Sequence, residues 1–465
     1  MTKRIKVLFI VGVFLLSVLS GCAETQSNNT YDIDDIDSIN DTVMFDSIIE
    51  SDDNIPNPAS ITIKGTEYST DLESLYLRDM QLTDADIEPL RYMTKLTWLY
   101  LNGNQISDVS VLAELTTLKY LILSDNQISD IGPLEGLKQL SILELRHNRI
   151  EDARMIEKFA YVNWLYLTGN PIVETVILND KLVMYNGPGG DIAIPDGVQY
   201  ILDEAFYGRS DVTGIFIPDS LISVFSARGF PYFVSPLSDC TSLINITVSK
   251  DHPTYSSKEG VLFSKDGAEL VLFPSGRSGS YAIPGGVKYV RVEPYGIVSP
   301  FSCEGLTSIS IPDSVEEMSW APFADCPQLK EINVNSGNRN YSSENGVLFN
   351  KEKTIIVAYP PGKTGAYTIP TGVTELGDYA FFNCIGLTSL TIPEGVTSLY
   401  YAVGDYIHTA FINCTGLTSV AIPKSVTNID DGVFDDCPDI TIHGYVGSEA
   451  HRYAEEKGIP FVAMN

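Results

Sequence analysis

The side chains that most often carry out enzymatic chemistry are few in this chain, and they follow no catalytic pattern. Its 465 residues include five His and seven Cys, and no HExxH, GxSxG or CxxC motif is present. Gly362-Lys363-Thr364 matches the end of a phosphate-binding loop, but Val357 occupies the place of the required glycine. We therefore expect no enzyme activity, no catalytic residue, no bound metal and no cofactor.

Aromatic and charged residues that recur at alternate positions indicate binding chemistry instead. Alternate residues of a strand share one face, so these side chains should lie together on one surface. Clusters of Trp and Tyr on rigid surfaces are frequent anchors of binding sites. The alternative explanation is that strands simply favour aromatic residues. The candidate ligand-binding residues are Tyr76, Arg78, Trp98, Tyr100, Tyr120, Glu144, Arg146, Trp164 and Tyr166.

The elements that would position these side chains are repeats with a 22-residue step. One copy reads Leu96-x-x-Leu99-x-Leu101-x-x-Asn104-x-Ile106, and the pattern returns three more times along the chain. The Leu-x-Leu alternation predicts a short strand whose leucines point inward. The Asn amide at the strand end can bond to backbone groups of neighbouring coils. We expect a structural ladder made of Asn104, Asn126, Asn148 and Asn170.

This pattern resembles internalin-like leucine-rich repeats, and a second pattern follows it. From Asp191 on, Ile-Pro pairs such as Ile392-Pro393 recur, most often at 23-residue steps, and resemble BspA-like (Treponema-type) leucine-rich repeats. Both resemblances imply a β-rich solenoid with a parallel concave sheet and short helices or 3-10 turns on its convex side. Residues 249–280 and 335–366 match each other 86 residues apart, and we expect them to form inserted β-hairpins.

Six of the seven cysteines share one position in the second type of repeat. Each stands three residues before the first strand residue of the next copy, and Arg209 holds that place in the first copy. Six extracellular cysteines could form three disulfides, but a shared repeat position favours free, buried thiols in a ladder. The predicted ladder consists of Cys240, Cys303, Cys326, Cys384, Cys414 and Cys437.

The start of the chain reads as a targeting segment. Lys3, Arg4 and Lys6 precede an apolar run, Val7 to Ser20, that is shorter than the ~20 residues a membrane-spanning helix needs. Leu19-Ser20-Gly21-Cys22 resembles a bacterial lipobox, which implies cleavage before Cys22 and lipidation of that residue. The alternative is a plain secretory signal. Both place the mature chain outside the cytoplasm.

Charge and composition complete the organisation. The formal net charge of −30 leaves no basic face for phosphate contacts, so we expect no nucleic-acid partner. Residues 23–58 contain ten acids and no Lys or Arg, which predicts an extended, disordered tether. Ser448 is expected to cap a short helix that closes the last coil. The predicted segments are a signal peptide (1–22), the tether (23–58), an internalin-like array (59–180), a BspA-like array (181–442) and a C-terminal cap (443–465).

The resemblance implies an adhesion role, because both families are associated with binding to host or partner proteins. We therefore expect a surface protein, anchored in the membrane by lipid on the extracellular face of the bacterial cell, whose partner is an extracellular protein such as a host matrix or surface protein. Binding would be non-covalent. Two alternatives remain: a glycan that stacks on the same aromatic residues, and a structural envelope protein without a ligand.

Overall fold

The computed structural model describes residues 57–225, 235–290, 299–319, 321–399, 401–403, 406–408 and 410–465. The predictions for the signal peptide, for lipidation of Cys22 and for the acidic tether lie outside these residues. Asn57–Asn465 form one compact unit. Within the described part of the chain, no helix is both long enough and apolar enough to cross a membrane.

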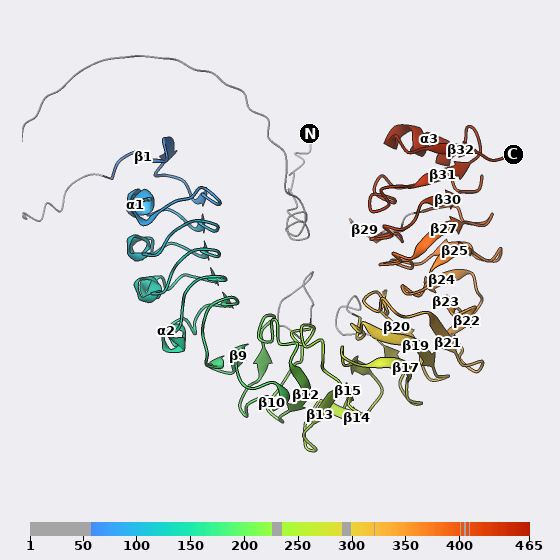
Figure 1. The fold of residues 1–465 in the computed structure, drawn as a ribbon, viewed down its shortest axis with the longest axis horizontal. Coiled ribbons are helices and arrows are strands. Elements are labelled where there is room, and N and C mark those ends of the chain that lie inside the picture. Colours follow the sequence, from blue (N-terminus) through green and yellow to red (C-terminus); the bar gives the residue numbers. More distant parts are fainter. Residues whose placement is uncertain are drawn as a thin grey trace, which may run out of the picture. The chain divides into compact units, whose positions relative to one another are not determined.

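A parallel five-stranded sheet forms one side of the first array (Figure 1). Its strands align in register, so that Leu75, Leu99 and Leu121 are direct neighbours. Short helices follow β3, β4, β5 and β6 on the opposite side of the coils, as the resemblance implied. The strands are β3 (Ser74–Tyr76), β4 (Trp98–Tyr100), β5 (Tyr120–Ile122), β6 (Ile142–Glu144) and β7 (Trp164–Tyr166). The helices are α1 (Asp84–Ile87), η1 (Glu88–Tyr92), η2 (Ser110–Glu114), η3 (Gly132–Gly136) and α2 (Ala153–Glu157).

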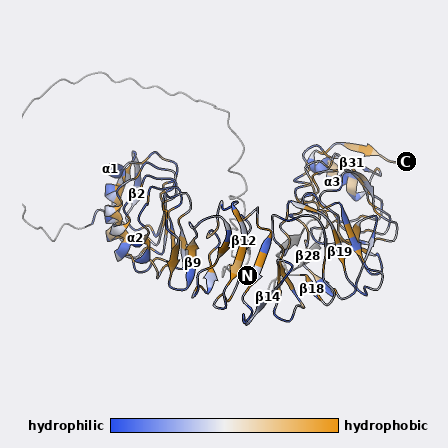
Figure 2. Cartoon of the chain, turned by 60° about the horizontal axis from the view of Figure 1, so that its bottom comes forward, coloured by the Kyte–Doolittle hydropathy of each residue, from blue (hydrophilic) through white to orange (hydrophobic). Residues whose placement is uncertain are grey.

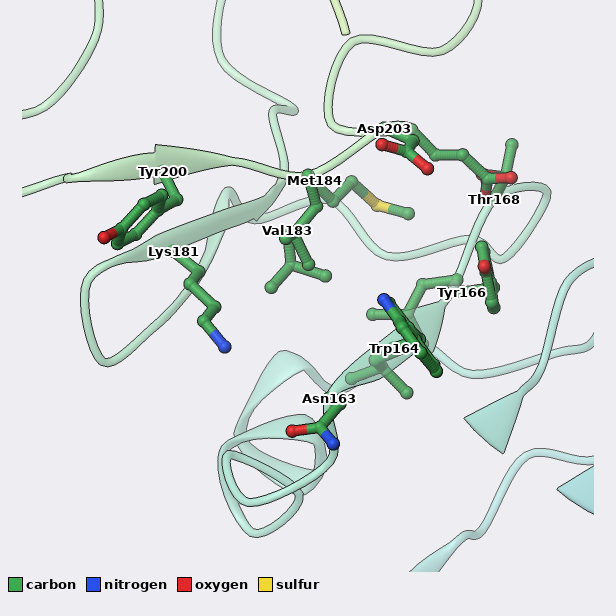
Figure 3. A pocket seen from close by; sticks show the side chains of 13 residues that line it. Asn163, Trp164, Tyr166, Thr168, Lys181, Val183, Met184, Tyr200 and Asp203 are labelled. Atoms are coloured by element: carbon green, nitrogen blue, oxygen red, sulfur yellow. The ribbon is translucent and has the colours of Figure 1, made fainter. Parts of the chain in front are cut away.

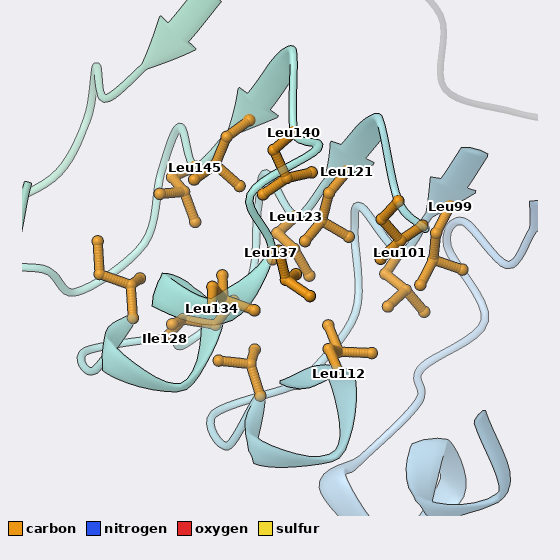
Figure 4. Close-up of a cluster of buried hydrophobic side chains, with 14 of the residues drawn as sticks. Leu99, Leu101, Leu112, Leu121, Leu123, Ile128, Leu134, Leu137, Leu140 and Leu145 are labelled. Carbon is orange, nitrogen blue, oxygen red and sulfur yellow. The ribbon is translucent and has the colours of Figure 1, made fainter. Parts of the chain in front are cut away.

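The core of this array is the space between the strands and the short helices. Figure 4 shows Leu99 and Leu121 of the strands, and Leu123 just after β5, pointing toward Leu112 and Leu134 of the 3-10 helices. All of these side chains are fully buried. Burial of a leucine contributes roughly 1.5–3 kcal/mol, and each coil obtains part of that burial from its neighbours. A hairpin of β1 (Ser60–Ile63) and β2 (Thr66–Ser69) begins the unit, with Ile61 and Ile63 in the core.

The predicted asparagines join one coil to the next. The Asn126 Nδ2 donates to the carbonyl oxygens of Leu101, at 2.9 Å, and of Leu123, at 3.1 Å. Its Oδ1 accepts from the backbone N of Ile106 at 3.0 Å. The buried amide thus satisfies backbone groups in its own coil and in the coil before it. Asn104, Asn148 and Asn170 make the same kind of contacts.

Parallel strands continue through the second array in separate small sheets. Strands such as β12 bury alternate apolar residues, and β12 is largely hydrophobic in Figure 2. The strands of these sheets are β10 (Gly190–Ala193), β12 (Val212–Ile217) and β13 (Asn245–Val248), then β17 (Ser278–Ala282), β19 (Gly305–Ile311) and β21 (Glu331–Val334), then β25 (Gly365–Thr368), β27 (Leu387–Thr391), β30 (Ser419–Ala421), β31 (Thr441–Gly444) and β32 (Phe461–Ala463). Smaller pairs are β18 (Tyr289–Val290) with β20 (Glu317–Met318), and β28 (Tyr401–Val403) with β29 (Tyr406–His408).

Both matching insertions contain the expected hairpin and one strand more. Val261 to Phe263 and Leu270 to Leu272 pair as predicted, and Tyr255–Lys258 adds a third strand because its backbone pairs with Val261–Ser264. The first insertion comprises β14 (Tyr255–Lys258), β15 (Val261–Ser264) and β16 (Leu270–Leu272). The second comprises β22 (Tyr341–Glu344), β23 (Val347–Asn350) and β24 (Ile355–Ala358), and β24 also pairs with β26 (Glu375–Leu376).

A similar hairpin joins the two arrays. Strand β8 (Val176–Leu178) pairs antiparallel with β9 (Lys181–Met184), and β9 pairs parallel with β11 (Tyr200–Ile201). The core of the first array includes Val183, and that of the second begins with Leu182, so neighbouring residues of β9 serve both cores. The arrays are therefore packed together through one strand.

The six cysteines of the second array are free and buried. The thiol of Cys303 donates to the carbonyl oxygen of Arg277 at 2.9 Å, and that of Cys414 to Phe381 at 3.0 Å. Burial raises the pKa of Cys240 and of Cys437 to about 12, so these thiols remain protonated and unreactive. In the first copy, the Arg209 guanidinium donates to the carbonyls of Tyr185 and Gly187.

Buried aromatic rings form a second ladder beside these thiols. The ring centroids of Tyr359, Phe381, Phe411 and Phe434 follow one another at 5.3, 5.3 and 5.4 Å. Tyr453 of the terminal helix α3 (Glu449–Lys457) continues the series at 6.0 Å. Ser448 occupies the expected N-cap position of α3, but its side chain makes no capping hydrogen bond. Gly458, at φ +68°, ends the helix as expected. The helix thus covers the last coil with a ring of the same ladder.

His252 in the first insertion stands at the position that Asn338 occupies in the second. Its Nδ1 accepts from the backbone N of Thr254 and Tyr255, and its Nε2 donates to the carbonyl oxygen of Leu221 at 3.0 Å. Asn338, 86 residues later, makes equivalent bonds with its amide to Asn340, Tyr341 and Val315. His252 is fully buried, and this burial lowers its pKa. The neutral imidazole is therefore a structural group.

The asparagine ladder leads to a stability prediction. Asn126→Ala removes the partner of the buried Ile106 N and one of the two amide donors to the Leu101 carbonyl, and we expect a loss of about 1–3 kcal/mol in the free energy of unfolding. Urea unfolding followed by far-UV circular dichroism measures this loss. The control is Asn163→Ala, an exposed residue whose amide reaches only the hydroxyl of Ser141. Equal losses for the two variants would contradict the ladder's role.

The buried histidine leads to a pH prediction. Because the pKa of His252 is lowered in the folded state, the unfolded chain takes up this proton at higher pH than the folded chain. The stability due to the neutral ring is complete above the ordinary histidine pKa of about 6.5 and is lost as the pH falls below it. As the pH falls, we expect the free energy of unfolding of the parent to decrease by up to ~1.4 kcal/mol per pH unit more than that of His252→Asn.

Urea unfolding at about pH 7.5 and about pH 5.5 measures this difference. The control, His443→Asn, changes a partly exposed histidine on β31 and should leave the pH dependence of the parent in place. A parent and His252→Asn with equal slopes would show that the buried imidazole does not control the acid response.

Candidate binding face and junction pocket

The predicted face residues come together in columns on the sheet of the first array. Ser74, Trp98, Tyr120, Ile142 and Trp164 are aligned by strand register in one column. Tyr76, Tyr100, Ile122, Glu144 and Tyr166 are aligned in the next. Parallel pairing without a shift puts equivalent residues directly beside each other. We call the aromatic members of the two columns the aromatic face: Tyr76, Trp98, Tyr100, Tyr120, Trp164 and Tyr166.

The rings of this face stack on one another along the ladder. The centroids of Trp98 and Tyr120 lie 3.5 Å apart with planes 9° apart, and those of Tyr76 and Tyr100 lie 4.6 Å apart at 15°. Such stacks cover ring faces and leave ring edges toward the solvent. Burial in the stack raises the pKa of Tyr100. Arg78, two residues after Tyr76 and just beyond β3, is exposed.

Two aromatic residues remain open to solvent. Tyr76 is 52% exposed at the start of the face, and Trp164 is 37% exposed at its end. Among the residues that the structure describes, no other ring stacks on Trp164. The face therefore offers ring edges along its length and a free ring surface on its last strand.

Arg146 and Glu144 differ from the expectation that they are available to orient a ligand. The Arg146 Nε donates to Glu204 at 2.7 Å, and its NH1 donates to Glu144 at 2.9 Å. The guanidinium also lies 4.1 Å from the centre of the Tyr166 ring. Burial alone would lower the pKa of Arg146, but the bonds and charges of Glu204 and Glu144 raise it. This cation is already paired within the protein.

Glu204 ties the second array to the first. Besides Arg146, its carboxylate accepts a bond from the Thr168 hydroxyl at 2.6 Å. The side chains of Arg146 and Glu204 are 22% and 21% exposed, so solvent weakens this ion pair less than it would a surface pair. The interaction could not be predicted from the repeat pattern, since its partners are 58 residues apart and belong to different repeat types.

A pocket of about 210 Å³ opens beside this ion pair, where the two arrays meet (Figure 3). Trp164 and Tyr166 of β7 form one wall. Val183 and Met184 of β9 lie opposite, and Tyr200 of β11 is nearby. The charged groups at the pocket are Lys181, Asp203 and Glu204. Of these lining residues, sequence reasoning identified only Trp164 and Tyr166.

The pocket exists because the strand ladder ends at β7. This strand is the edge of the five-stranded sheet, and β8 pairs with β9 instead of continuing the ladder. No next coil therefore covers Trp164 as Trp98 is covered by Tyr120. The signal in the sequence is the loss of the 22-residue step after Asn170.

The described residues contain no group of three or more His, Cys, Asp or Glu side chains that could hold a metal ion.

A second pocket, of about 380 Å³, lies over the cysteine turns of the second array and is lined largely by polar residues such as Ser302, Asn383 and Asn413. Leucine-rich-repeat solenoids are in general scaffolds that bind proteins through their extended surfaces.

Family models match most of the solenoid. The BspA type leucine-rich-repeat model matches residues 181–258, 298–354 and 363–442. Two further leucine-rich-repeat models match residues 116–158 and 70–128. A comparison with curated proteins gave no match.

Solved bacterial structures are similar to parts of this chain. A leucine-rich-repeat protein from Eubacterium ventriosum is 25% identical over 56% of this chain and 67% of its own, with a TM-score of 0.39. Internalin C2 from Listeria monocytogenes is 35% identical over 22% of this chain and 45% of its own, with a TM-score of 0.21. A leucine-rich cell surface protein from Faecalibacterium prausnitzii is 20% identical over 85% of this chain and 88% of its own, with a TM-score of 0.31.

The ion pair at the junction leads to a prediction. Glu204→Gln leaves the half-buried Arg146 with Glu144 alone and weakens the bond from Thr168, so we expect a loss of about 1–3 kcal/mol in the free energy of unfolding. Hydrogen exchange should quicken first in β7, β9 and β11. The control is Glu135→Gln, which breaks an exposed pair with Lys158 and should cost less than about 1 kcal/mol. Unchanged exchange at the junction would refute the coupling.

Proposed function

Because the chain belongs to the leucine-rich-repeat proteins, with repeats of BspA type in its second array, we propose that it is a lipid-anchored bacterial surface protein that binds another protein. Binding is non-covalent and uses the aromatic face of the first array. The partner is an extracellular protein, such as a host matrix or host surface protein. Adhesion is the role that this combination of anchor, tether and binding face would serve.

The stack of partly exposed rings on a rigid sheet supports this proposal most directly. Trp98, Tyr100 and Tyr120 are each only partly buried, although a solvated strand face could be filled with polar residues. Stacking fixes their rotamers before a ligand arrives, and side chains that are already ordered lose little entropy on binding. Aromatic residues held in this way are typical anchors of protein interfaces.

The stacking also favours a protein over a glycan as the ligand. A sugar ring packs against the face of an aromatic ring, and the facing surfaces of Trp98 and Tyr120 cover each other at 3.5 Å. The exposed edges carry the positive side of the ring quadrupole and the tyrosine hydroxyls, which suit backbone carbonyls and carboxylates of a protein. A glycan could stack only where a ring face is open, as at Trp164.

The anchor and the charge complete the proposal. Cys22 in Leu19-Ser20-Gly21-Cys22 supports lipidation, and the acidic residues 23–58 would hold the solenoid away from the membrane. The net charge of −30 favours the approach of a partner with a basic surface. Binding to such a partner would weaken as salt screens the charges.

Binding to a panel of matrix proteins and glycans tests this function. The probe is the compact unit, residues 57–465, beside a variant with Trp98, Tyr100, Tyr120 and Trp164 changed to Ala. We expect a protein ligand whose affinity falls at least about 100-fold in the variant, because several interface anchors are lost together. Circular dichroism is used to check that the variant is folded.

The matched control changes Tyr92 and Tyr207 to Ala, two exposed tyrosines outside the aromatic face. It should bind as the parent does. A ligand that binds all three forms equally would place the site elsewhere, and a neutral glycan that alone binds the parent would replace the protein partner. If nothing on the panel binds, the proposed function loses its support.

A further inference from the structure

We propose that the junction pocket receives one arginine side chain of the partner, with the guanidinium stacked on Trp164 and bonded to Asp203. This inference rests on the proposed function, because it names the partner group that the end of the aromatic face recognises. The pocket arises where the ladder of the first array ends, and the sequence marks that place only by the loss of the 22-residue step. Its size, its open ring and its charges each narrow the choice of occupant.

The volume limits the occupant to a single side chain. At about 210 Å³, the pocket is smaller than the ~300–1,000 Å³ of sites that enclose whole small molecules. It is continuous with the aromatic face through Trp164 and Tyr166, which belong to both. A protein lying along that face can therefore insert one side chain at its end, as anchors of protein interfaces do.

Trp164 provides a surface for a flat or cationic group. Its indole is 37% exposed and lines the pocket together with Met184 and Val183 (Figure 3). A guanidinium is planar and positively charged, so it can stack on an indole with both dispersion and cation–π attraction. The same contact already occurs inside the protein, where the Arg146 guanidinium lies 4.1 Å from the Tyr166 ring centre.

The charges place the cation at one end of the pocket. The Asp203 carboxylate and the Lys181 ammonium lie on opposite sides of it in Figure 3. Counting the ion pair beside the pocket, the carboxylates of Asp203, Glu204 and Glu144 face the cations Lys181 and Arg146. A carboxylate has acceptor sites for several donors, so Asp203 can bind a guanidinium beside its present contacts.

Arginine fits this arrangement better than the other candidates. Lysine carries a point charge that bonds to Asp203 but gains less from a flat indole. A phenylalanine would stack on the indole but would donate no hydrogen bond to the Asp203 carboxylate. An acidic side chain could bond to Lys181 but would be repelled by the carboxylates of Asp203 and Glu204. The acidic chain as a whole also attracts basic partners.

A titration with capped tripeptides tests the proposal on the full-length chain in a non-ionic detergent. The probes are acetyl-Gly-Arg-Gly-amide and its citrulline counterpart, which keeps the shape of arginine without its charge. Saturation-transfer NMR measures the dissociation constants. We expect the arginine probe to bind, and citrulline to bind about five-fold or more weakly, because the cation–π and charged hydrogen-bond contributions are lost.

Variants locate the probe. Asp203→Asn and Trp164→Leu should each weaken the arginine probe about three- to ten-fold. Tyr92→Leu, the matched control at an exposed aromatic residue outside the aromatic face, should leave its affinity unchanged. Lys181→Met should strengthen binding, since it removes the cation that opposes the ligand, and this gain would not arise from a folding defect.

Contrary results overturn the proposal clearly. Equal binding of arginine and citrulline, no binding of either, or binding that survives both Asp203→Asn and Trp164→Leu would remove it. An acetyl-Gly-Glu-Gly-amide probe that binds more tightly and requires Lys181 would assign the pocket to an anion instead. A partner protein that binds the aromatic face while the arginine probe does not bind would leave the proposed function intact and refute only the pocket.

Discussion

A coil of this protein cannot bury its own apolar side chains, and the rest of the structure depends on that constraint. Leu99 and Leu121 come from strands of only three residues, and each is shielded from water by the coils on either side. Stacking also brings backbone groups of adjacent coils under cover, where they need partners. Asn126 meets that need with one amide that bonds to two coils. Stability in such a chain is therefore a property of neighbouring coils.

The two arrays use different side chains to bond the buried backbone groups at their turns. In the first array, the asparagine amide both donates and accepts. In the second, a cysteine thiol donates to a carbonyl of the preceding coil, and the rings around Phe381 and Phe411 fill the space between coils. Arg209 takes over the thiol's role where the second array begins, and His252 takes over the amide's role of Asn338. Different side chains thus serve one requirement, namely a partner for a buried backbone group.

The same alignment that satisfies the backbone also shapes the surface. Register without a shift places Trp98 on Tyr120, which orders the rings and turns their edges outward. Where the alignment stops, at β7, the last ring is left open and a pocket forms. The junction is closed beside that pocket by Glu204, which bonds to Arg146 and Thr168. The aromatic face and the pocket are therefore consequences of the unshifted strand ladder from β3 to β7 and of its end at β7.

The sequence by itself determined the coils, because the repeats have a regular spacing. Within each repeat, the leucines, asparagines or cysteines stand at positions with the same structural role. The strands, the columns containing Trp98 and Tyr100, and the closing helix after Ser448 all follow from that periodicity. Only the tertiary structure decided which side chains are already engaged and which remain open. Arg146 is paired with Glu204 from another repeat type, and Trp164 is exposed because β8 leaves the ladder. These outcomes depend on contacts at the irregular junction, where residues distant in sequence meet and no repeat spacing predicts the pairing.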